Sequence, residues 1–149
     1  TNDAPSTIIR LVDLGIENFL LTATLEAIIA QRLARRICLK CKEEYVPSES
    51  ELMELELRPE DVAGRTFFRG KGCSACNSSG YKGRLAVFEA MLMDDMIREL
   101  IMSQASTSLL RQESRKRGMR TLRESGLLSI YDGRTTIDEV LKETISEEN

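Results

Sequence analysis

The four cysteines of the chain form two Cys-x-x-Cys pairs, Cys38 with Cys41 and Cys73 with Cys76. Two intervening residues let both sulfur atoms of a pair face one point from a tight turn, and two such turns complete a tetrahedral shell. Shells of this kind hold structural Zn²⁺, and four protein ligands leave no position for a water molecule. The pattern therefore predicts a closed zinc site that holds two distant chain segments together, not a hydrolytic centre.

Other interpretations of the cysteines stay open from spacing alone. Iron also accepts thiolate ligands, and the thiols could be free and buried. A redox pair would need a βαβ context, which neither pair has, and disulfides would need a secreted protein, whereas no signal-peptide pattern begins the chain. The 31 residues between the pairs, 42–72, exceed the roughly 15–20 of the usual finger spacing. We therefore expect residues 42–72 to form a small loop or helix of their own.

The residues around the second pair are suited to support a metal site. Backbone N–H groups in a tight turn can donate to thiolate sulfur and hold it in place. The sequence after Cys73 is rich in turn residues, and we expect such donors among Ser74, Asn77, Ser78, Ser79 and Gly80.

No catalytic constellation is visible in the sequence. The chain has no histidine to serve as a general base and no Gly-x-Ser-x-Gly elbow. The stretch GRTFFRGKG, residues 64–72, resembles a phosphate loop, but its spacing is wrong by one residue and Gly72 stands where Ser or Thr is needed. We therefore expect no catalytic residue in the chain.

Composition and charge narrow the class of protein. The net charge of −3 and the many acidic side chains within residues 43–61 disfavour binding to nucleic acid. No apolar run approaches the roughly 18 residues of a membrane span, so no transmembrane segment is predicted and the chain reads as cytosolic. A basic cluster is either a solvated helix face or a contact with another subunit or an anion; it comprises Arg111, Arg115, Lys116, Arg117, Arg120 and Arg123.

Apolar periodicity predicts the elements before the second cysteine pair. Asp3 is a suitable N-cap for a helix that ends near Gly15, and apolar residues at helical spacing predict a second helix over residues 19–36. Ser48 and Glu51 form a capping box for a short helix over 49–55. The stretch TFFR, residues 66–69, is expected to be a short strand.

One strand and several helices are predicted after the second pair. Residues 84–93 are almost continuously apolar, which is typical of a strand buried on both faces. Glu89 interrupts this run and is either buried and paired, for instance with an arginine, or placed at a cleft. The remaining pattern is helical, with helices expected near 95–103, 107–117, 121–131 and 136–145. Asp94 and Asp95 fit a helix N-terminus better than a metal site.

Two stretches taken together resemble a known family. AIIAQRLARRICLKC, residues 27–41, and GYKGRLAVFE, residues 80–89, are similar to the C-terminal part of the type II secretion and type IV pilus assembly ATPases, and the resemblance extends over nearly all of residues 1–145. Members of that family are cytoplasmic hexameric motors that dock on inner-membrane components. The resemblance implies homo-oligomeric partners, a location at the inner membrane, and Cys38, Cys41, Cys73 and Cys76 as zinc ligands.

The resemblance also implies a fold and a division into parts. The fold class expected is α+β and mostly helical, as a piece of a RecA-like α/β ATPase domain with an inserted zinc-binding subdomain and a C-terminal helical subdomain. The parts expected are RecA-like core helices over 1–37, the zinc subdomain over 38–83, a strand returning to the core sheet over 84–93 and the helical subdomain over 94–149.

The expected activity differs between the chain and its parent. The phosphate loop and acidic boxes of the family lie upstream of the residues matched here, so ATP and Mg²⁺ are expected only in the full-length parent, and the chain alone is expected to be inactive. Arg84 either stacks on the nucleotide base in the parent enzyme or begins its strand and pairs with an acid. The alternative function is a free-standing structural zinc module that binds a protein adaptor or nucleic acid.

Overall fold

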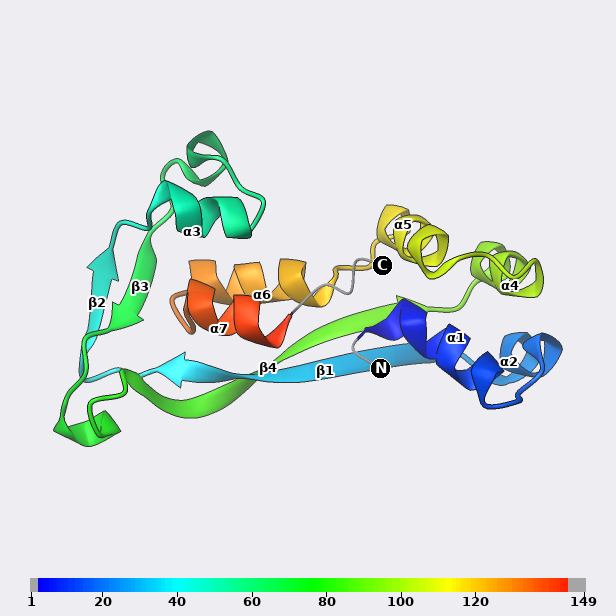
Figure 1. Cartoon of the computed structure of the whole chain (residues 1–149), viewed down its shortest axis with the longest axis horizontal. Helices are drawn as coiled ribbons and strands as arrows, with labels where there is room; N and C mark the ends of the chain where they lie inside the picture. The colour runs from blue at the N-terminus through cyan, green and yellow to red at the C-terminus, as the bar shows by residue number, and fades with distance from the viewer. Residues whose placement is uncertain (1–2, 145–149) are drawn as a thin grey trace. The chain divides into compact units, whose positions relative to one another are not determined.

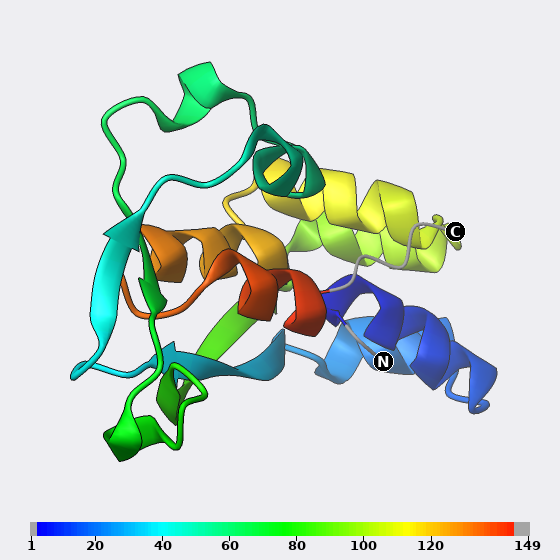
Figure 2. The ribbon, with the colours of Figure 1, turned by 60° about the vertical axis from the view of Figure 1, so that its left-hand side comes forward.

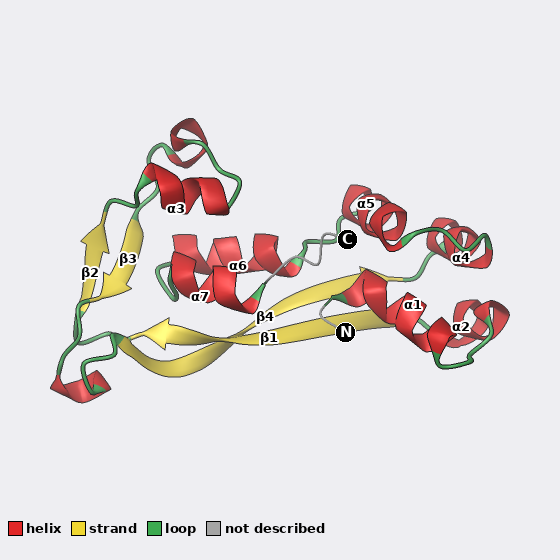
Figure 3. Cartoon of the chain, viewed as in Figure 1, coloured by secondary structure: helices red, strands yellow, loops and turns green. Residues whose placement is uncertain are grey.

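The computed structural model describes residues 3–144, and these form two compact units. The first unit holds the described residues of 1–31 together with 88–122, and the second holds 32–87 with the described residues of 123–149. Helices, strands and loops alternate along both units (Figure 3). The predicted α+β class is confirmed, whereas the predicted boundaries at residues 37, 83 and 93 stay predictions. Among the described residues, no helix has the length and apolar character needed to span a membrane.

The first unit is built mainly from helices around an aliphatic core. Its helices are α1 (Ala4–Asp13), α2 (Asn18–Thr24), α4 (Asp95–Met102) and α5 (Thr107–Lys116) (Figure 1). The predicted N-caps are confirmed, because Asp3 accepts a hydrogen bond from the Ser6 N–H and Asp94 accepts one from the Ile97 N–H. The buried core comprises Ala4, Ile8, Leu21, Met91, Ile97, Ile101, Leu110 and Met119.

The second unit packs two helices against a small antiparallel sheet. Strands β2 (Lys42–Tyr45) and β3 (Phe67–Gly70) pair with Tyr45 opposite Phe67, and α3 (Glu49–Glu54) with the 3-10 turn η1 (Pro59–Val62) connects them. Figure 2 shows α6 (Leu122–Tyr131) beside α7 (Ile137–Glu143). The buried core comprises Leu52, Leu55, Val62, Phe67, Ile130, Ile137 and Val140.

The local signals of the second unit were sufficient to predict its short elements. The capping box of Ser48 and Glu51 is present at the start of α3, as expected. The predicted strand 66–69 is confirmed with a shift of one residue, and the four predicted C-terminal helices are all present. The predicted end of the last helix, residue 145, lies outside the described residues.

The predicted helix over residues 19–36 is wrong. Only its first part is helical, as α2, and β1 (Ala27–Ile37) follows and pairs with β4 (Tyr81–Leu92). The apolar residues Ile29 and Leu33 match a helical period, but in β1 their side chains are 65% and 46% exposed while Ala34 is buried. Pairing with β4 therefore overrides the helix propensity of this Ala- and Arg-rich segment.

The predicted strand is confirmed as β4, but its burial on both faces is wrong. Val87, Glu89 and Met91 are buried. In contrast, Phe88, which lies between Val87 and Glu89, is 50% exposed, and Leu92, which follows Met91, is 71% exposed. This alternation is the period of a strand with one covered face. In the part of the chain that the structure describes, the sheet of β1 and β4 has only these two strands.

Glu89 is buried, and its partners are backbone groups. One carboxylate oxygen accepts the N–H of Ala4 and the other accepts the N–H of Leu122, each at 2.9 Å. These N–H groups belong to the first residues of α1 and α6, which have no partner within their own helices. Burial raises the pKa of Glu89, although both N–H groups oppose the shift. The side chain thus caps two helices at once, which settles the alternatives left open by the sequence.

Candidate metal site

Each Cys-x-x-Cys pair lies in a tight turn of the second unit. The first pair joins β1 to β2, and the Cys41 N–H donates to the Cys38 carbonyl at 3.4 Å. The second pair encloses the 3-10 turn η2 (Ser74–Cys76), where the Cys76 N–H donates to the Cys73 carbonyl at 3.3 Å. Backbone hydrogen bonds within each turn therefore bring the two sulfur atoms of a pair to the same side.

Backbone contacts also join the two turns to each other. The Cys38 N–H donates to the Gly80 carbonyl at 2.9 Å, and the Lys71 N–H donates to the Cys41 carbonyl at 3.0 Å. These bonds connect residues that are 42 and 30 positions apart, as the numbers 38 and 80, and 41 and 71, show. The four cysteines are thereby assembled by the backbone around them.

The sulfur atoms form a cluster with the dimensions of a metal shell. The Sγ atoms of Cys38 and Cys73 are 3.8 Å apart, those of Cys41 and Cys76 are 3.8 Å apart, and those of Cys73 and Cys76 are 3.7 Å apart. All four lie within 4.8 Å of one another. A tetrahedron with Zn–S bonds near 2.3 Å has edges of about 3.8 Å. The separations far exceed the roughly 2.05 Å of a disulfide. The four residues therefore form a cluster that could hold a metal ion.

Three backbone N–H groups point at the sulfur atoms. Gly72 donates to Cys41 Sγ at 3.3 Å, Cys73 donates to Cys76 Sγ at 3.3 Å and Gly80 donates to Cys76 Sγ at 3.2 Å. Such donors stabilise negative charge on a thiolate ligand. Gly80 was among the expected donors, whereas Gly72 and Cys73 were missed. Their position in the sequence could have identified them, because Gly72 immediately precedes the second cysteine pair and Cys73 begins it.

The surroundings of two cysteines shift their pKa values in opposite directions. Desolvation raises the pKa of Cys76, but the Cys73 and Gly80 N–H groups outweigh it and lower this pKa to about 6. Desolvation and the neighbouring thiols raise the pKa of Cys41 to about 11. Cys38 and Cys76 are buried and the other two cysteines are half-buried. A site with four sulfur donors and this degree of enclosure suits a structural metal ion, not a catalytic one.

Arg84 is not one of the four residues of the cysteine cluster. It is an exposed residue near the start of β4. Its guanidinium has no hydrogen bond or ion pair with any of residues 3–144, so the pairing with an acid that the sequence allowed is not found there.

Similarity to known proteins was found along almost the whole chain. Residues 1–142 match the family model described as "Type II/IV secretion system protein". The chain is 45% identical over 146 residues to the type IV pilus assembly ATPase PilB of Myxococcus xanthus, with 97% of this chain and 26% of that protein covered. It is 39% identical over 147 residues to the type II secretion system protein E of Pseudomonas aeruginosa, with 99% of this chain and 29% of that protein covered.

The chain covers a smaller share of a third relative. The chain is 41% identical over 145 residues to PilB of Thermus thermophilus, with 97% of this chain but 16% of that protein covered. The chain thus spans between 16% and 29% of the length of these curated relatives. Because the family model covers nearly all of the sequence, the chain belongs to the type II/IV secretion system protein family and carries a four-cysteine cluster within it.

Proposed function

We propose that this chain is the zinc-binding C-terminal part of a hexameric cytoplasmic motor ATPase that powers type II secretion or type IV pilus assembly. In this proposal its fold is part of a RecA-like ATPase domain with an inserted zinc subdomain. Its role is contact with neighbouring subunits and with inner-membrane components. ATP and Mg²⁺ are bound by the intact protein. The family match and the names of the relatives, which are ATPases and secretion proteins, support this assignment.

The observation that carries the proposal is the geometry of the four sulfur atoms. Separations of 3.7–3.8 Å fit the edges of a tetrahedral thiolate shell around zinc. Four soft thiolate donors without histidine or carboxylate favour Zn²⁺ over hard cations such as Mg²⁺. Cys38, Cys41, Cys73 and Cys76 would be the ligands, and zinc would supply folding free energy there.

The expected energetic effect of zinc is large. Structural zinc sites contribute about 10–16 kcal/mol of apparent binding free energy, whereas a whole domain is stable by about 5–15 kcal/mol. The metal would therefore be a main determinant of stability in the second unit. A rigid second unit could then present a constant surface to neighbouring subunits.

Metal analysis combined with native mass spectrometry tests the zinc assignment. We expect one zinc ion per chain in reduced protein, and a lower thermal unfolding midpoint after chelation. Cys41→Ser should lower the zinc content, whereas Ser50→Ala, at an exposed position of α3, should leave it unchanged. Reduced protein that binds no zinc, or that unfolds at the same temperature after chelation, would contradict the assignment.

The role in contact is tested in the intact ATPase. We expect Cys41→Ser to reduce hexamer formation and pilus or secretion output together. The isolated 149-residue chain is expected to show no ATP turnover. Turnover by the isolated chain, or a fully assembled and active intact enzyme without the cysteines, would overturn this role.

We also propose that Arg84 stacks on the nucleotide base in the intact enzyme. A planar guanidinium can lie against the face of adenine. Its exposure, and the lack of an acidic partner among residues 3–144, leave the guanidinium available. Arg84→Ala should raise the nucleotide KM, while Lys82→Ala, which removes a charge from an exposed position on the same strand, should not. An unchanged nucleotide KM in Arg84→Ala would contradict the stacking role.

A further inference from the structure

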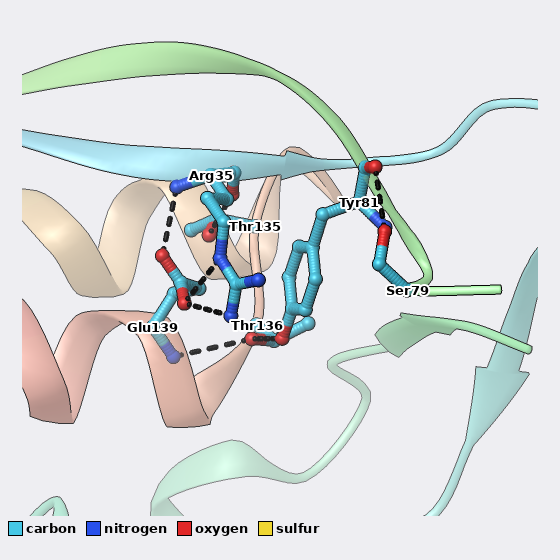
Figure 4. Close-up of polar contacts among 6 residues, drawn as sticks. All are labelled: Arg35, Ser79, Tyr81, Thr135, Thr136 and Glu139. Atoms are coloured by element: carbon cyan, nitrogen blue, oxygen red, sulfur yellow. Dashed lines mark hydrogen bonds and ion pairs between the residues drawn. The ribbon is translucent and has the colours of Figure 1, made fainter. Parts of the chain in front are cut away.

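We infer that the metal cluster controls the docking of helix α7, with Arg35 and Tyr81 as the positioning residues that transmit metal binding to the helix. The inference rests on the proposed zinc site and adds a consequence for the C-terminal helix pair. All of the residues involved lie in the second unit. Figure 4 shows the contacts that join them.

The segment that enters the first cysteine pair contacts α7 through Arg35. This residue lies three positions before Cys38. Its backbone N–H donates to one oxygen of Glu139 at 2.8 Å, and its guanidinium donates to the other oxygen from Nε at 2.9 Å and from Nη2 at 2.8 Å. The Glu139 side chain is only 2% exposed. The buried Glu139 carboxylate on α7 therefore accepts three hydrogen bonds from Arg35.

The segment that leaves the second cysteine pair contacts α7 through Tyr81. This residue follows Gly80, whose N–H donates to Cys76 Sγ. The Tyr81 hydroxyl is 2.7 Å from the Thr136 hydroxyl, which is the N-cap of α7 and accepts the Glu139 N–H. The Arg35 guanidinium carbon also lies 4.1 Å from the centre of the Tyr81 ring. In Figure 4 the guanidinium lies between the Glu139 carboxylate and the Tyr81 ring.

Two hydrogen bonds to backbone carbonyls also hold the turn between α6 and α7 against β1. The Ile37 N–H donates to the Arg134 carbonyl at 2.9 Å, and the Thr135 hydroxyl donates to the Arg35 carbonyl at 2.8 Å. Thr135 is fully buried, and Ile137 is 1% exposed. The α6–α7 turn therefore sits on the two chain segments that the cysteine cluster joins.

A metal ion changes the freedom of these two segments. Four bound thiolates fix the ends of β1 and β4 beside the cluster, and hence the positions of Arg35 and Tyr81. Without the metal, the distance between the Tyr81 ring and the Arg35 guanidinium is no longer fixed. The Glu139 carboxylate then loses its donor Arg35, and the Thr136 hydroxyl loses its partner Tyr81. Because linkage is reciprocal, a metal that favours docked α7 must bind more weakly when α7 cannot dock.

Hydrogen exchange in the full chain tests the first half of this linkage. Chelation of zinc should raise exchange in α7 well above the rise in α3, which packs on the same core but does not touch the Arg35 network. In Tyr81→Phe and Arg35→Lys, exchange in α7 should already be high with metal bound, and chelation should add little. An equal response of α3 and α7 would indicate general loosening and overturn the inference.

Cobalt affinity tests the second half. Co²⁺ is titrated into reduced, metal-free protein, and thiolate coordination is followed by its visible absorption. Arg35→Lys keeps the charge but loses the planar fork, and should weaken Co²⁺ binding at least about fivefold. Arg69→Lys is the matched control, because Arg69 pairs with Glu43 and lies over the Tyr45 ring without touching α7, and its affinity should match the wild type.

The outcomes separate the inference from the proposed function. Wild-type protein without a cobalt–thiolate spectrum contradicts the metal site itself. Wild-type protein that binds Co²⁺, with Arg35→Lys binding equally well and α7 exchange unaffected by chelation, retains the metal site and overturns the inference.

Discussion

Gly70 and Gly80 lie so close together that neither position has room for a side chain. A Cβ atom added to Gly70 would overlap the Gly80 carbonyl oxygen, and one added to Gly80 would lie 2.5 Å from the Gly70 carbonyl oxygen. Both atoms that block these positions belong to the backbone, so they cannot swing aside. The end of β3 and the start of β4 can therefore meet beside the cysteine cluster only if both residues are glycine.

Gly70→Ala is expected to disrupt the metal site without altering any cysteine. The new methyl group must push the segment containing Gly80 away, and the Gly80 N–H then no longer reaches Cys76 Sγ. We expect weaker Co²⁺ binding and a loss of about 1–3 kcal/mol in the free energy of unfolding of the metal-bound protein. Cobalt titration and denaturant unfolding measure the two effects.

The control for this substitution is Gly64→Ala. Gly64 has open space around the Cβ position but a φ of +79°, so the substitution adds backbone strain without a collision. It should lower stability and leave cobalt affinity unchanged. Equal cobalt affinity in both variants would mean that the close approach of Gly70 and Gly80 does not support the cluster.

The cysteine cluster was predictable because its geometry is local. Two residues between cysteines determine how one pair turns, and thiolate chemistry leaves few choices for four such ligands. The N–H donors were only partly predictable. Gly72 donates to Cys41, which is 31 positions earlier in the chain, and that pairing depends on the β2–β3 hairpin and not on any local pattern.

The strand conformation of β1 could not be predicted from the sequence alone. Its side chains alternate between exposed and more buried positions, but apolar Ile29 is 65% exposed while Arg32 is half-buried. Hydropathy therefore does not follow burial along β1, and neither proline nor glycine separates it from α2. The partner that makes this segment a strand is β4, about 50 residues later, so the deciding interaction is non-local.

Glu89→Ala is expected to destabilise the first unit. The substitution leaves the buried N–H groups of Ala4 and Leu122 without an acceptor, at a cost of about 1–3 kcal/mol for each group. Urea unfolding measures the loss. Glu99→Ala on α4 is the control, since Glu99 is exposed, and should stay within about 0.5 kcal/mol of the wild type. A similar small effect for both variants would contradict the double cap.

Glu89 also makes a specific contribution to the pH dependence of stability. Burial raises its pKa above the ordinary 4.5, so the folded chain binds more protons than the unfolded chain in the interval between the two values. Stability from this group is therefore greatest below pH 4.5 and falls as pH rises through the folded pKa. The difference in unfolding free energy between wild type and Glu89→Ala should narrow with rising pH across this interval. A gap that widens would contradict the raised pKa.

Thr136→Ala is expected to cost more than the loss of an ordinary N-cap. The substitution removes the acceptor of the Glu139 N–H and the partner of the hydroxyl of half-buried Tyr81. N-cap removal alone costs about 0.5–2 kcal/mol, and the unpaired hydroxyl adds to it. Ser48→Ala removes the exposed N-cap of α3 and should cost less, while Thr136→Ser should stay near the wild type. Equal losses for the two alanine variants in thermal unfolding would argue against the Tyr81 contact.

Gly126 and Val140 set the distance between α6 and α7. A Cβ atom at Gly126 would lie 2.7 Å from Val140 Cγ1 and 3.0 Å from Cγ2, and Val140 is 1% exposed. A β-branched side chain in a helix has one strongly preferred rotamer, so Val140 cannot turn away. Gly126→Ala gains about 1 kcal/mol in helix propensity, but the forced separation of the helices should outweigh this gain.

The double variant Gly126→Ala with Val140→Ala distinguishes packing from propensity. Shortening Val140 removes both atoms that collide with the new methyl group, which also fills part of the space left by the valine. The double variant should therefore be more stable than the sum of the two single losses by about 0.5–3 kcal/mol. Denaturant unfolding of the four proteins gives this coupling energy. Losses that add to within about 0.5 kcal/mol would show that the two residues do not determine the packing of α6 against α7.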